Sequence, residues 1–131
     1  MKVVFDKIAS ATKNARVARS ALLSPVIPAR EGQVIAVRVR GHKSVYNTLE
    51  DLYGRMIPLN DGDIVAGVLG HRRALRGYAG EVPESVAPGD LIDILNLGGV
   101  MGKCTSSNVE LGPPLKGEVL GAVLSFPTLG E

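Results

Sequence analysis

The chain has 131 residues, of which 45% are hydrophobic, with one cysteine, no tryptophan and a formal net charge of +2. This length and apolar content fit one domain with its own core and exclude a disordered chain. A single cysteine excludes an internal disulfide framework and predicts a reducing, cytoplasmic setting. No apolar run is long enough to span a membrane, so no membrane partner is expected.

The charge is unevenly distributed along the chain. Residues 1–43 contain nine Lys and Arg against two Asp and Glu, whereas residues 44–131 contain six against eleven. A basic first third is typical of an arm that binds nucleic acid or a membrane surface. The alternative is that the two regions neutralise each other, within one subunit or between copies. We favour neutralisation, because no run of five like charges occurs.

Residues 1–24 are predicted to form an N-terminal helical segment of a single domain, 1–131, whose β-barrel body is residues 25–131. A competing interpretation makes Lys2–Ile8 a strand and starts a helix near Ser10. The segment also resembles an organellar transit peptide in its Arg, Ser and Ala content. We favour docking of the segment on the body, or pairing with another subunit. The residues that would form one helical face, at steps of three and four, are Val4, Ile8, Ala11, Ala15, Ala18 and Leu22.

The next elements alternate between strand and turn signals. Gln33–Arg40 has strand periodicity with one solvent-exposed face. Ser44–Tyr53 suits one short additional helix, with Ser44 as N-cap and Gly54 as its stop. Ile64–Leu69 follows strong turn residues and is predicted to be a buried strand.

The second half of the chain is also predicted to contain short strands. Residues 70–80 are bounded by glycines and suit a connection or β-hairpin. Leu91–Leu95 is predicted to be a strand, and Asn96–Asn108 is loop-like at both ends with a short strand at its centre. The last strand is predicted over Glu118–Phe126.

A short phrase recurs along the chain: a glycine, then Asp, Glu or Gln, then β-favouring apolar residues. Its copies are almost evenly spaced, which indicates one supersecondary unit used several times. Short strands at this spacing predict a mainly β fold, a small closed β-barrel or a compact sandwich. The four copies begin at Gly32-Gln33, Gly62-Asp63, Gly89-Asp90 and Gly117-Glu118.

Two of these copies, Gly62-Asp63 and Gly89-Asp90, resemble the GD box of cradle-loop β-barrels, the group that includes double-psi, RIFT and swapped-hairpin barrels. The resemblance covers roughly residues 26–126. It implies that each glycine permits a turn and that Asp63 and Asp90 are structural caps of backbone amides on a neighbouring connection. A paired-carboxylate acid/base site is the alternative role for these two residues. The copies with Gln33 and Glu118 depart from the motif.

The same phrases also resemble barrel-sandwich hybrids of the biotinyl- and lipoyl-carrier type. In those carriers a lysine lies on an exposed hairpin in a Met-Lys or Asp-Lys context. Here Lys103 follows Gly102 and Lys43 follows His42, so neither lysine matches. A carrier role is therefore not expected.

Residues Gly98–Ser107 are the best candidate for a small anionic ligand, because glycines allow close backbone approach and Lys103 supplies charge. A nucleotide P-loop is not expected, since Leu97 stands where its first glycine would be and Cys104 follows Lys103. The structural alternative is a glycine-rich connection. The residues predicted to bind the anion are Gly98, Gly99, Gly102, Lys103, Thr105 and Ser106, with Arg72, Arg73 and Arg76.

Two basic patches could converge on such a ligand. One is His71, Arg72, Arg73 and Arg76, and the other is Arg38, Arg40, His42 and Lys43. Their charges would suit a phosphorylated metabolite, nucleic acid or an acidic protein surface. The alternative is that these arginines are solvated or pair with acids such as Asp61, Glu81 and Glu84.

No catalytic constellation stands out. Cys104 could be a nucleophile if Lys103 lowered its pKa and His42 or His71 lay beside it, but a small buried thiol is the interpretation we favour. No His, Cys, Asp or Glu cluster has metal-ligand spacing, and neither a metal nor a cofactor is expected.

The sequence therefore predicts a non-catalytic binding or assembly module. It would self-associate as a homo-oligomer or act as an accessory domain beside other domains of a larger protein. The alternative is a small protein or enzyme that binds an anion or phosphometabolite through residues 98–107 and the arginine patch. Nucleic-acid binding is a third hypothesis, and it lacks an interleaved aromatic platform.

Overall fold

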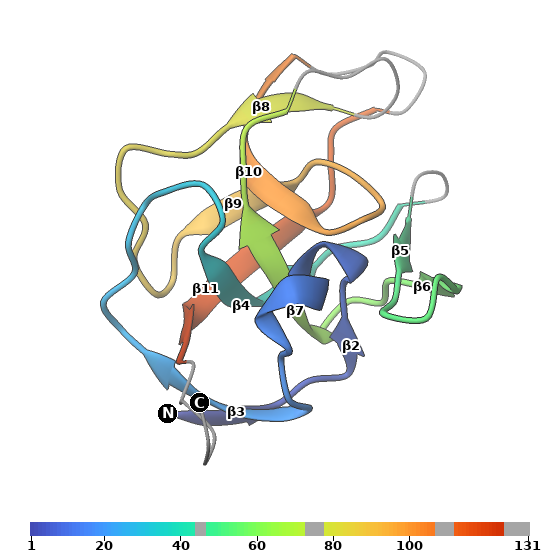
Figure 1. Cartoon of the computed structure of the whole chain (residues 1–131). Helices are drawn as coiled ribbons and strands as arrows, with labels where there is room; N and C mark the ends of the chain where they lie inside the picture. The colour runs from blue at the N-terminus through green and yellow to red at the C-terminus, as the bar shows by residue number, and fades with distance from the viewer. Residues whose placement is uncertain (44–46, 73–77, 107–111, 125–131) are drawn as a thin grey trace.

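The computed structural model describes residues 1–43, 47–72, 78–106 and 112–124, and this part of the chain is mainly β (Figure 1). The strands and the 3-10 helix η1 follow in the order β1 Lys2–Val4, β2 Lys7–Ile8, η1 Ser10–Ala15, β3 Ser20–Ser24, β4 Val34–Arg40, β5 Thr48–Glu50, β6 Met56–Pro58, β7 Ile64–Leu69, β8 Ala79–Glu81, β9 Leu91–Ile94, β10 Val100–Ser106 and β11 Lys116–Val123. None of the described helical residues forms a helix long and apolar enough to cross a membrane.

Five strands form a ring of hydrogen-bonded neighbours. β11 pairs with β4, β4 with β7, β7 with β10, β10 with β9, and β9 returns to β11. All of these pairs are antiparallel except β7 with β10, which is parallel. The strands predicted over residues 33–40, 64–69 and 91–95 are confirmed as β4, β7 and β9.

Three of the four glycine phrases form the same corner before a strand. Gly62 has a φ of +89°, donates its N–H to Val39 O at 2.7 Å, and Val39 N donates back to Asp63 O at 2.8 Å. Gly89 and Asp90 exchange the same two hydrogen bonds with Val119, as do Gly32 and Gln33 with Leu69. Gly117 differs, because it lies inside β11 beside Val37 and its φ is not positive. Glycine adopts a left-handed φ more easily than other residues do, which explains why a glycine stands at each of these three corners.

The described core consists of two apolar clusters. The larger one draws side chains from all five ring strands, and the smaller one lies between the N-terminal segment and the β4–β7 pair. Ala36 and Ala66, which are register partners at the centre of that pair, are fully buried beneath the N-terminal segment. The face of β4 that was predicted to be exposed carries Val34, Ala36, Arg38 and Arg40. It is therefore partly covered.

The N-terminal helix predicted over residues 1–24 is wrong. This segment contains β1, β2, η1 and β3, so the competing interpretation with an early strand was closer. Val4 and Leu22, which the helical stripe would place in the core, are 57% and 44% exposed. Val3 and Phe5 are buried instead, because the segment alternates with the period of a strand and pairs with β3.

The short helix predicted over Ser44–Tyr53 is also wrong where the chain is described. Thr48–Glu50 is β5, which pairs with β6, and residues 44–46 lie outside the described ranges. Leu49 is fully buried, and Glu50 N donates to Leu97 O at 2.6 Å. These tertiary contacts outweigh a helix pattern that rests on only three apolar positions.

The remaining predictions hold in part. The described ends of residues 70–80 pair with each other, since Arg72 and Gly80 exchange two backbone hydrogen bonds, as a hairpin requires. The central strand predicted within residues 96–108 is longer than expected and forms β10. The final strand runs over Lys116–Val123, while residues 125 and 126 of its predicted end lie outside the described ranges.

Candidate binding surfaces

Asp63 and Asp90 belong to separate corners and hydrogen-bond to their own turns. Asp63 Oδ2 accepts the N–H of Asn60, and Asp90 Oδ2 accepts the N–H of Ala87, each at 2.9 Å. Asp63 also forms an ion pair with Lys7 of the N-terminal segment. The carboxylates thus bond to backbone within their own turns rather than to a neighbouring connection.

The segment predicted to cradle an anion is a turn followed by a strand. Gly98 and Gly99 lie in the turn before β10, where a Cβ on Gly99 would meet Ala9 Cβ at 2.2 Å. Gly102 lies within β10, and a Cβ there would meet Glu81 O at 2.5 Å. These glycines therefore allow close packing of backbone segments. Lys103 and Thr105 are exposed on β10, Ser106 ends this strand, and Ser107 lies outside the described ranges.

The predicted arginine patches are only partly described. Arg73 and Arg76 lie outside the described ranges, and the backbone of Arg72 pairs with Gly80. In the second patch Arg40 forms an ion pair with Glu118. Two of the ion pairs thus link the basic first third to acids further along the chain, Lys7 with Asp63 and Arg40 with Glu118.

The rest of the second patch consists of Arg38, His42 and Lys43. Arg38 is half-buried on β4, and His42 is exposed. Lys43 donates to Pro113 O at 2.9 Å and lies 5.9 Å from the ring centre of Tyr78. Burial lowers the pKa of Lys43. These contacts give Lys43 a structural role in joining the chain before β5 to the chain before β11.

Cys104 lies on β10 and is half-buried. Its backbone N–H donates to Asp93 Oδ2 at 2.8 Å, and Asp93 Oδ1 pairs with Lys116. His71 accepts the N–H of Val82 through Nδ1 at 3.3 Å. His71 therefore has a structural contact.

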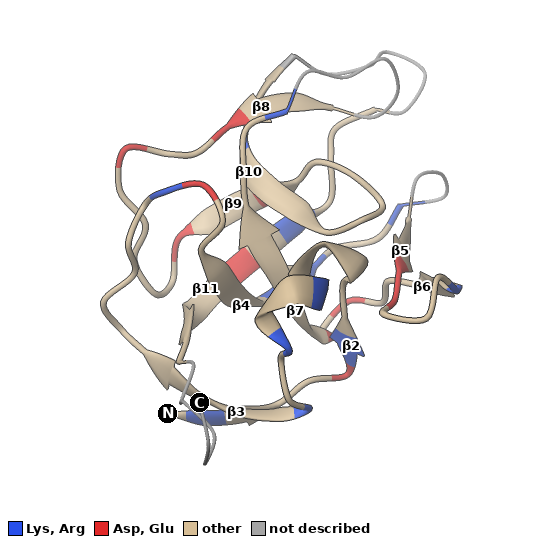
Figure 2. Cartoon of the chain, viewed as in Figure 1, with Lys and Arg blue, Asp and Glu red and all other residues tan. Residues whose placement is uncertain are grey.

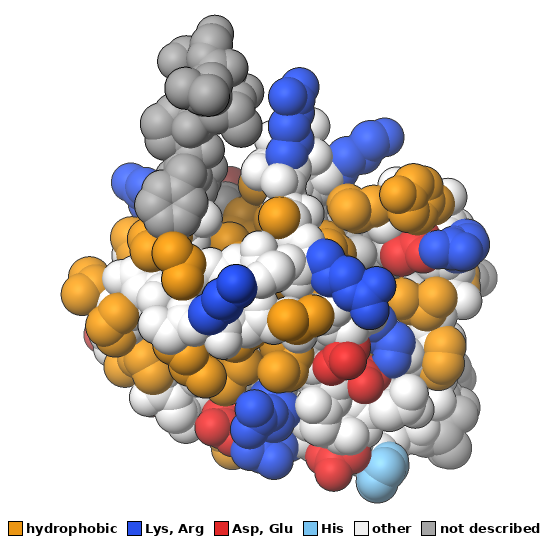
Figure 3. Space-filling view, turned by 90° about the horizontal axis from the view of Figure 1, so that it is seen from below, with side chains coloured by type: hydrophobic (Ala, Val, Ile, Leu, Met, Phe, Trp, Pro, Cys, Tyr) orange, Lys and Arg blue, Asp and Glu red, His pale blue; other side chains and the backbone are white. Residues whose placement is uncertain are grey.

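Sequence reasoning missed a surface at the end of the sheet, which we call the terminal ribbon: β1, β3 and residues 122–124. Val4, Leu22 and Leu124 are 57%, 44% and 42% exposed. Lys2 pairs in register with Leu22, and Leu124 N donates to Leu22 O at 3.0 Å, so the three segments lie side by side. Figure 3 shows apolar side chains on this side of the molecule, with Lys and Arg between them. The β-favouring run Val3-Val4-Phe5 was the sequence signal for this ribbon.

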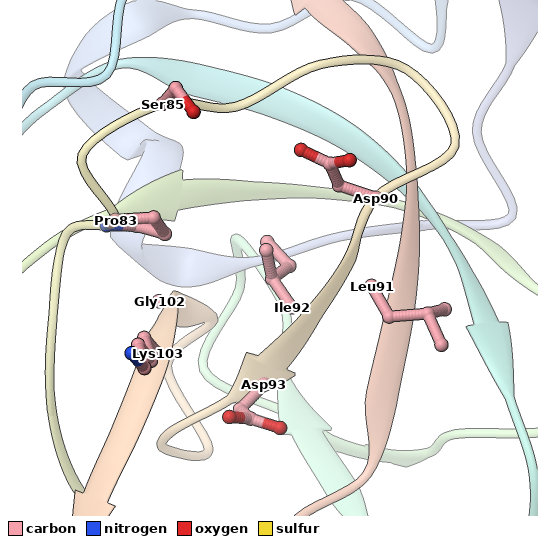
Figure 4. A pocket seen from close by; sticks show the side chains of 8 residues that line it. All are labelled: Pro83, Ser85, Asp90, Leu91, Ile92, Asp93, Gly102 and Lys103. Atoms are coloured by element: carbon pink, nitrogen blue, oxygen red, sulfur yellow. The ribbon is translucent and has the colours of Figure 1, made fainter.

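A half-open pocket of about 300 Å³ lies between β9, β10 and the connection before β9 (Figure 4). Lys103 lines it, and no ion pair of the Lys103 ammonium is found within the described ranges. Gly98, Gly99 and Thr105 are not among its lining residues, so the predicted anion set is not gathered here. The residues that line the pocket are Pro83, Ser85, Asp90, Leu91, Ile92, Asp93, Gly102 and Lys103.

In the described part of the chain, no group of three His, Cys, Asp or Glu side chains is placed to hold a metal ion. Comparison of this chain with protein-family models, with curated proteins and with solved structures found no match.

Proposed function

We propose that this protein is a non-catalytic binding and assembly module, built on a small closed barrel of the cradle-loop kind. The ring of five strands supports the barrel, as does the shared corner geometry. The β4–β7 pair adds further support. Each of its strands begins at a glycine corner that bonds to the far end of the other strand, which gives the pair an approximate twofold symmetry.

The acids of the described chain support a non-catalytic role. Six aspartates accept backbone N–H groups, and three of them also pair with a Lys or Arg. These carboxylates are fixed by structural contacts, whereas a general base needs a carboxylate that faces a substrate. The six are Asp6, Asp51, Asp61, Asp63, Asp90 and Asp93.

The observation that carries the binding function is the terminal ribbon. β1 ends the sheet and pairs only with β3 among the described strands. Val3 faces Ala21 between the hydrogen-bonded pairs Met1–Leu23 and Phe5–Arg19, so the backbone groups of Lys2 and Val4 point away from β3. Such an edge can add a strand from a partner.

The residues around this edge define its partner. Residues 1–24 carry five Lys and Arg and one Asp, and Val4 and Leu22 supply exposed apolar area. An extended segment that alternates apolar and acidic residues would pair with the backbone of β1, cover the apolar side chains and face the cations.

A labelled peptide of alternating Val and Glu tests this function. We expect fluorescence anisotropy to show binding that weakens with salt, because ion pairs at an exposed edge are screened. Val4→Pro should weaken binding by about tenfold or more, since it removes an outward N–H without breaking a bond to β3.

Val4→Ala is the matched control, because it shortens the same side chain and keeps the N–H. A peptide with Lys in place of Glu should not bind. Equal binding by the Pro and Ala variants, or by both peptides, would contradict strand addition at β1.

A second candidate function is the binding of an anionic metabolite, and the observation that favours it is Lys103 lining the half-open pocket, whereas Asp90 and Asp93 of the same lining count against it. Inorganic phosphate or a sugar phosphate would then raise the melting temperature, and Lys103→Ala would abolish that shift. Lys13→Ala, at an exposed lysine of η1, is the control. No shift with the unmodified protein would exclude this candidate.

A further inference from the structure

The molecule carries a second exposed surface whose charge is opposite to that of the terminal ribbon. We call it the acidic rim: Glu81, Glu84, Asp90 and Leu91 around the half-open pocket. All four residues are exposed, and Leu91 is 62% exposed. With the neighbouring Lys103 included, three acids face one cation, which gives this surface a net negative charge.

The glutamates of the rim have few partners within the molecule. No ion pair or side-chain hydrogen bond of Glu81 or Glu84 is found in the described ranges, and neither is found for Lys2 or Arg19 on the ribbon. Within the described chain, each surface therefore has unpaired charge of one sign beside exposed apolar side chains. A surface with both properties is suited to association.

We propose that the partner of the terminal ribbon is a second copy of this chain, which docks its acidic rim there. This proposal rests on the ribbon as the binding surface and names its occupant. The connection between β8 and β9 contains no strand; Val86 forms an isolated bridge with Ile27, and Gly89 and Asp90 bond to Val119 of β11. Glu84 lies on this connection, and Glu81 ends β8, the last strand of a sheet order that begins with β1, so both exposed acids lie where the ribbon edge of another copy can reach them.

The two surfaces lie on different sides of the molecule. In Figure 2 the acids of the β8–β9 connection line the upper left, whereas β1 and β3 lie at the bottom with a Lys or Arg at each end. One copy cannot place its own rim on its own ribbon. In a head-to-tail contact between copies, each copy keeps one free ribbon or rim for a further neighbour.

The uneven charge of the chain has a physical role in this arrangement. Opposite charges at the two ends attract one copy to the next and repel the ribbon-to-ribbon and rim-to-rim contacts. Because these charges are exposed, the association is expected to be strong at low salt and weak at high salt.

Light scattering over a range of protein concentrations tests the proposal. At about 0.05 M salt the mean mass should rise with concentration, and at about 0.5 M salt it should fall toward the monomer. Reversal of the ribbon charges (Lys2→Glu with Arg19→Glu) should give monomers, and so should reversal of the rim charges (Glu81→Lys with Glu84→Lys).

Two further samples identify the contact. The ribbon variant carries an acidic ribbon and an acidic rim, and the rim variant carries a basic ribbon and a basic rim. Neither should associate alone, whereas their equimolar mixture should associate as the wild type does, because every rim then meets a ribbon of opposite charge. A chain with all four reversals should associate again, because the charges are opposite once more. Unchanged melting temperatures would show that the variants are folded.

Several results would overturn the proposal. A wild-type protein that is monomeric at all concentrations and low salt would do so, and so would a fourfold variant that stays monomeric. If the Val–Glu peptide still binds β1 in either case, the binding function stands and only the second copy is excluded. If the peptide fails while the charge reversals abolish association, the ribbon binds its own copies by charge without strand addition.

Discussion

At the scale of single residues, the structure assigns the carboxylates to turns. Asp51 is the clearest case, since Oδ1 accepts the N–H groups of Tyr53 and Arg55 at 2.9 Å and Oδ2 accepts Arg55 Nε at 3.0 Å. These bonds hold the turn between β5 and β6, where Tyr53 is 83% exposed. In the sequence, the only signal of this turn is Asp51 shortly before Gly54.

This environment makes one contribution to stability depend on pH. The Arg55 backbone N–H, followed by the Tyr53 N–H and the Arg55 guanidinium, lowers the pKa of Asp51 despite its burial. The folded protein therefore keeps this charge to a lower pH than the unfolded chain does. The stabilisation is present above the ordinary carboxyl pKa and is lost as the pH falls through the lowered value.

We expect Asp51→Asn to reduce the melting temperature at neutral pH and to have a smaller effect in strong acid, where the wild-type carboxylate becomes protonated. Thermal unfolding of both proteins between neutral and acidic pH measures this. Glu84→Gln, at an exposed acid, is the control. Melting curves that stay equally far apart at every pH would show that the charge of Asp51 does not stabilise the fold.

At the scale of elements, the turn before β10 contains glycines that were predicted to bind a ligand. In the structure these glycines allow close packing. Gly99 has a φ of +90° and packs against Ala9, and its N–H donates to Asn96 O at 3.2 Å. Ala11 N donates to Gly98 O at 2.9 Å, which joins η1 to the same turn. The turn therefore connects the N-terminal segment to the ring.

Gly99→Ala combines two costs, a left-handed backbone and a clash with Ala9. We expect it to destabilise the protein by about 2–4 kcal/mol. Gly62→Ala is the matched control, because Gly62 also has a positive φ but no atom lies within 4 Å of an added Cβ. It should cost only about 1–2 kcal/mol. Urea unfolding measures both, and equal losses would show that the contact with Ala9 is not limiting.

At the scale of the whole molecule, residues 1–24 are part of the described fold. They supply β1, β2 and β3, and Val3, Phe5 and Leu23 are buried in the smaller cluster. Asp6 N donates to Ile64 O at 2.8 Å, and Asp6 Oδ2 accepts Ile64 N at 2.7 Å. These contacts support docking on the body and give a transit peptide no support.

Removal of residues 1–24 should therefore destabilise the rest severely. Burial of each large apolar side chain contributes about 1.5–3 kcal/mol, and a domain has a total stability of only about 5–15 kcal/mol. Circular dichroism should show a truncated protein that has lost cooperative thermal unfolding. Phe5→Ala in the full chain, expected to cost about 3–5 kcal/mol, is the graded comparison. A truncated chain that melts like the full one would contradict this role.

Much of the ring could be predicted from local pattern. β4, β7 and β9 each follow a glycine corner and carry apolar runs or alternation, so periodicity and turn chemistry identify them. The described residues of the predicted anion site do not gather at one place. Gly98 and Gly99 lie in a turn, and Lys103 lines a pocket, while Arg73 and Arg76 lie outside the described ranges. Proximity between such residues depends on which strands pair, and no local pattern specifies that.

The amino-acid sequence alone determined that the chain is mainly β and where its glycine corners fall, because both follow from side-chain alternation and from the freedom of glycine at positive φ. Only the tertiary structure decided that most of residues 2–8 and all of 48–50 are strands, and that a basic, apolar edge and an acidic rim lie on different sides. Short segments have weak intrinsic preferences, and the strand or surface that each one meets determines its conformation.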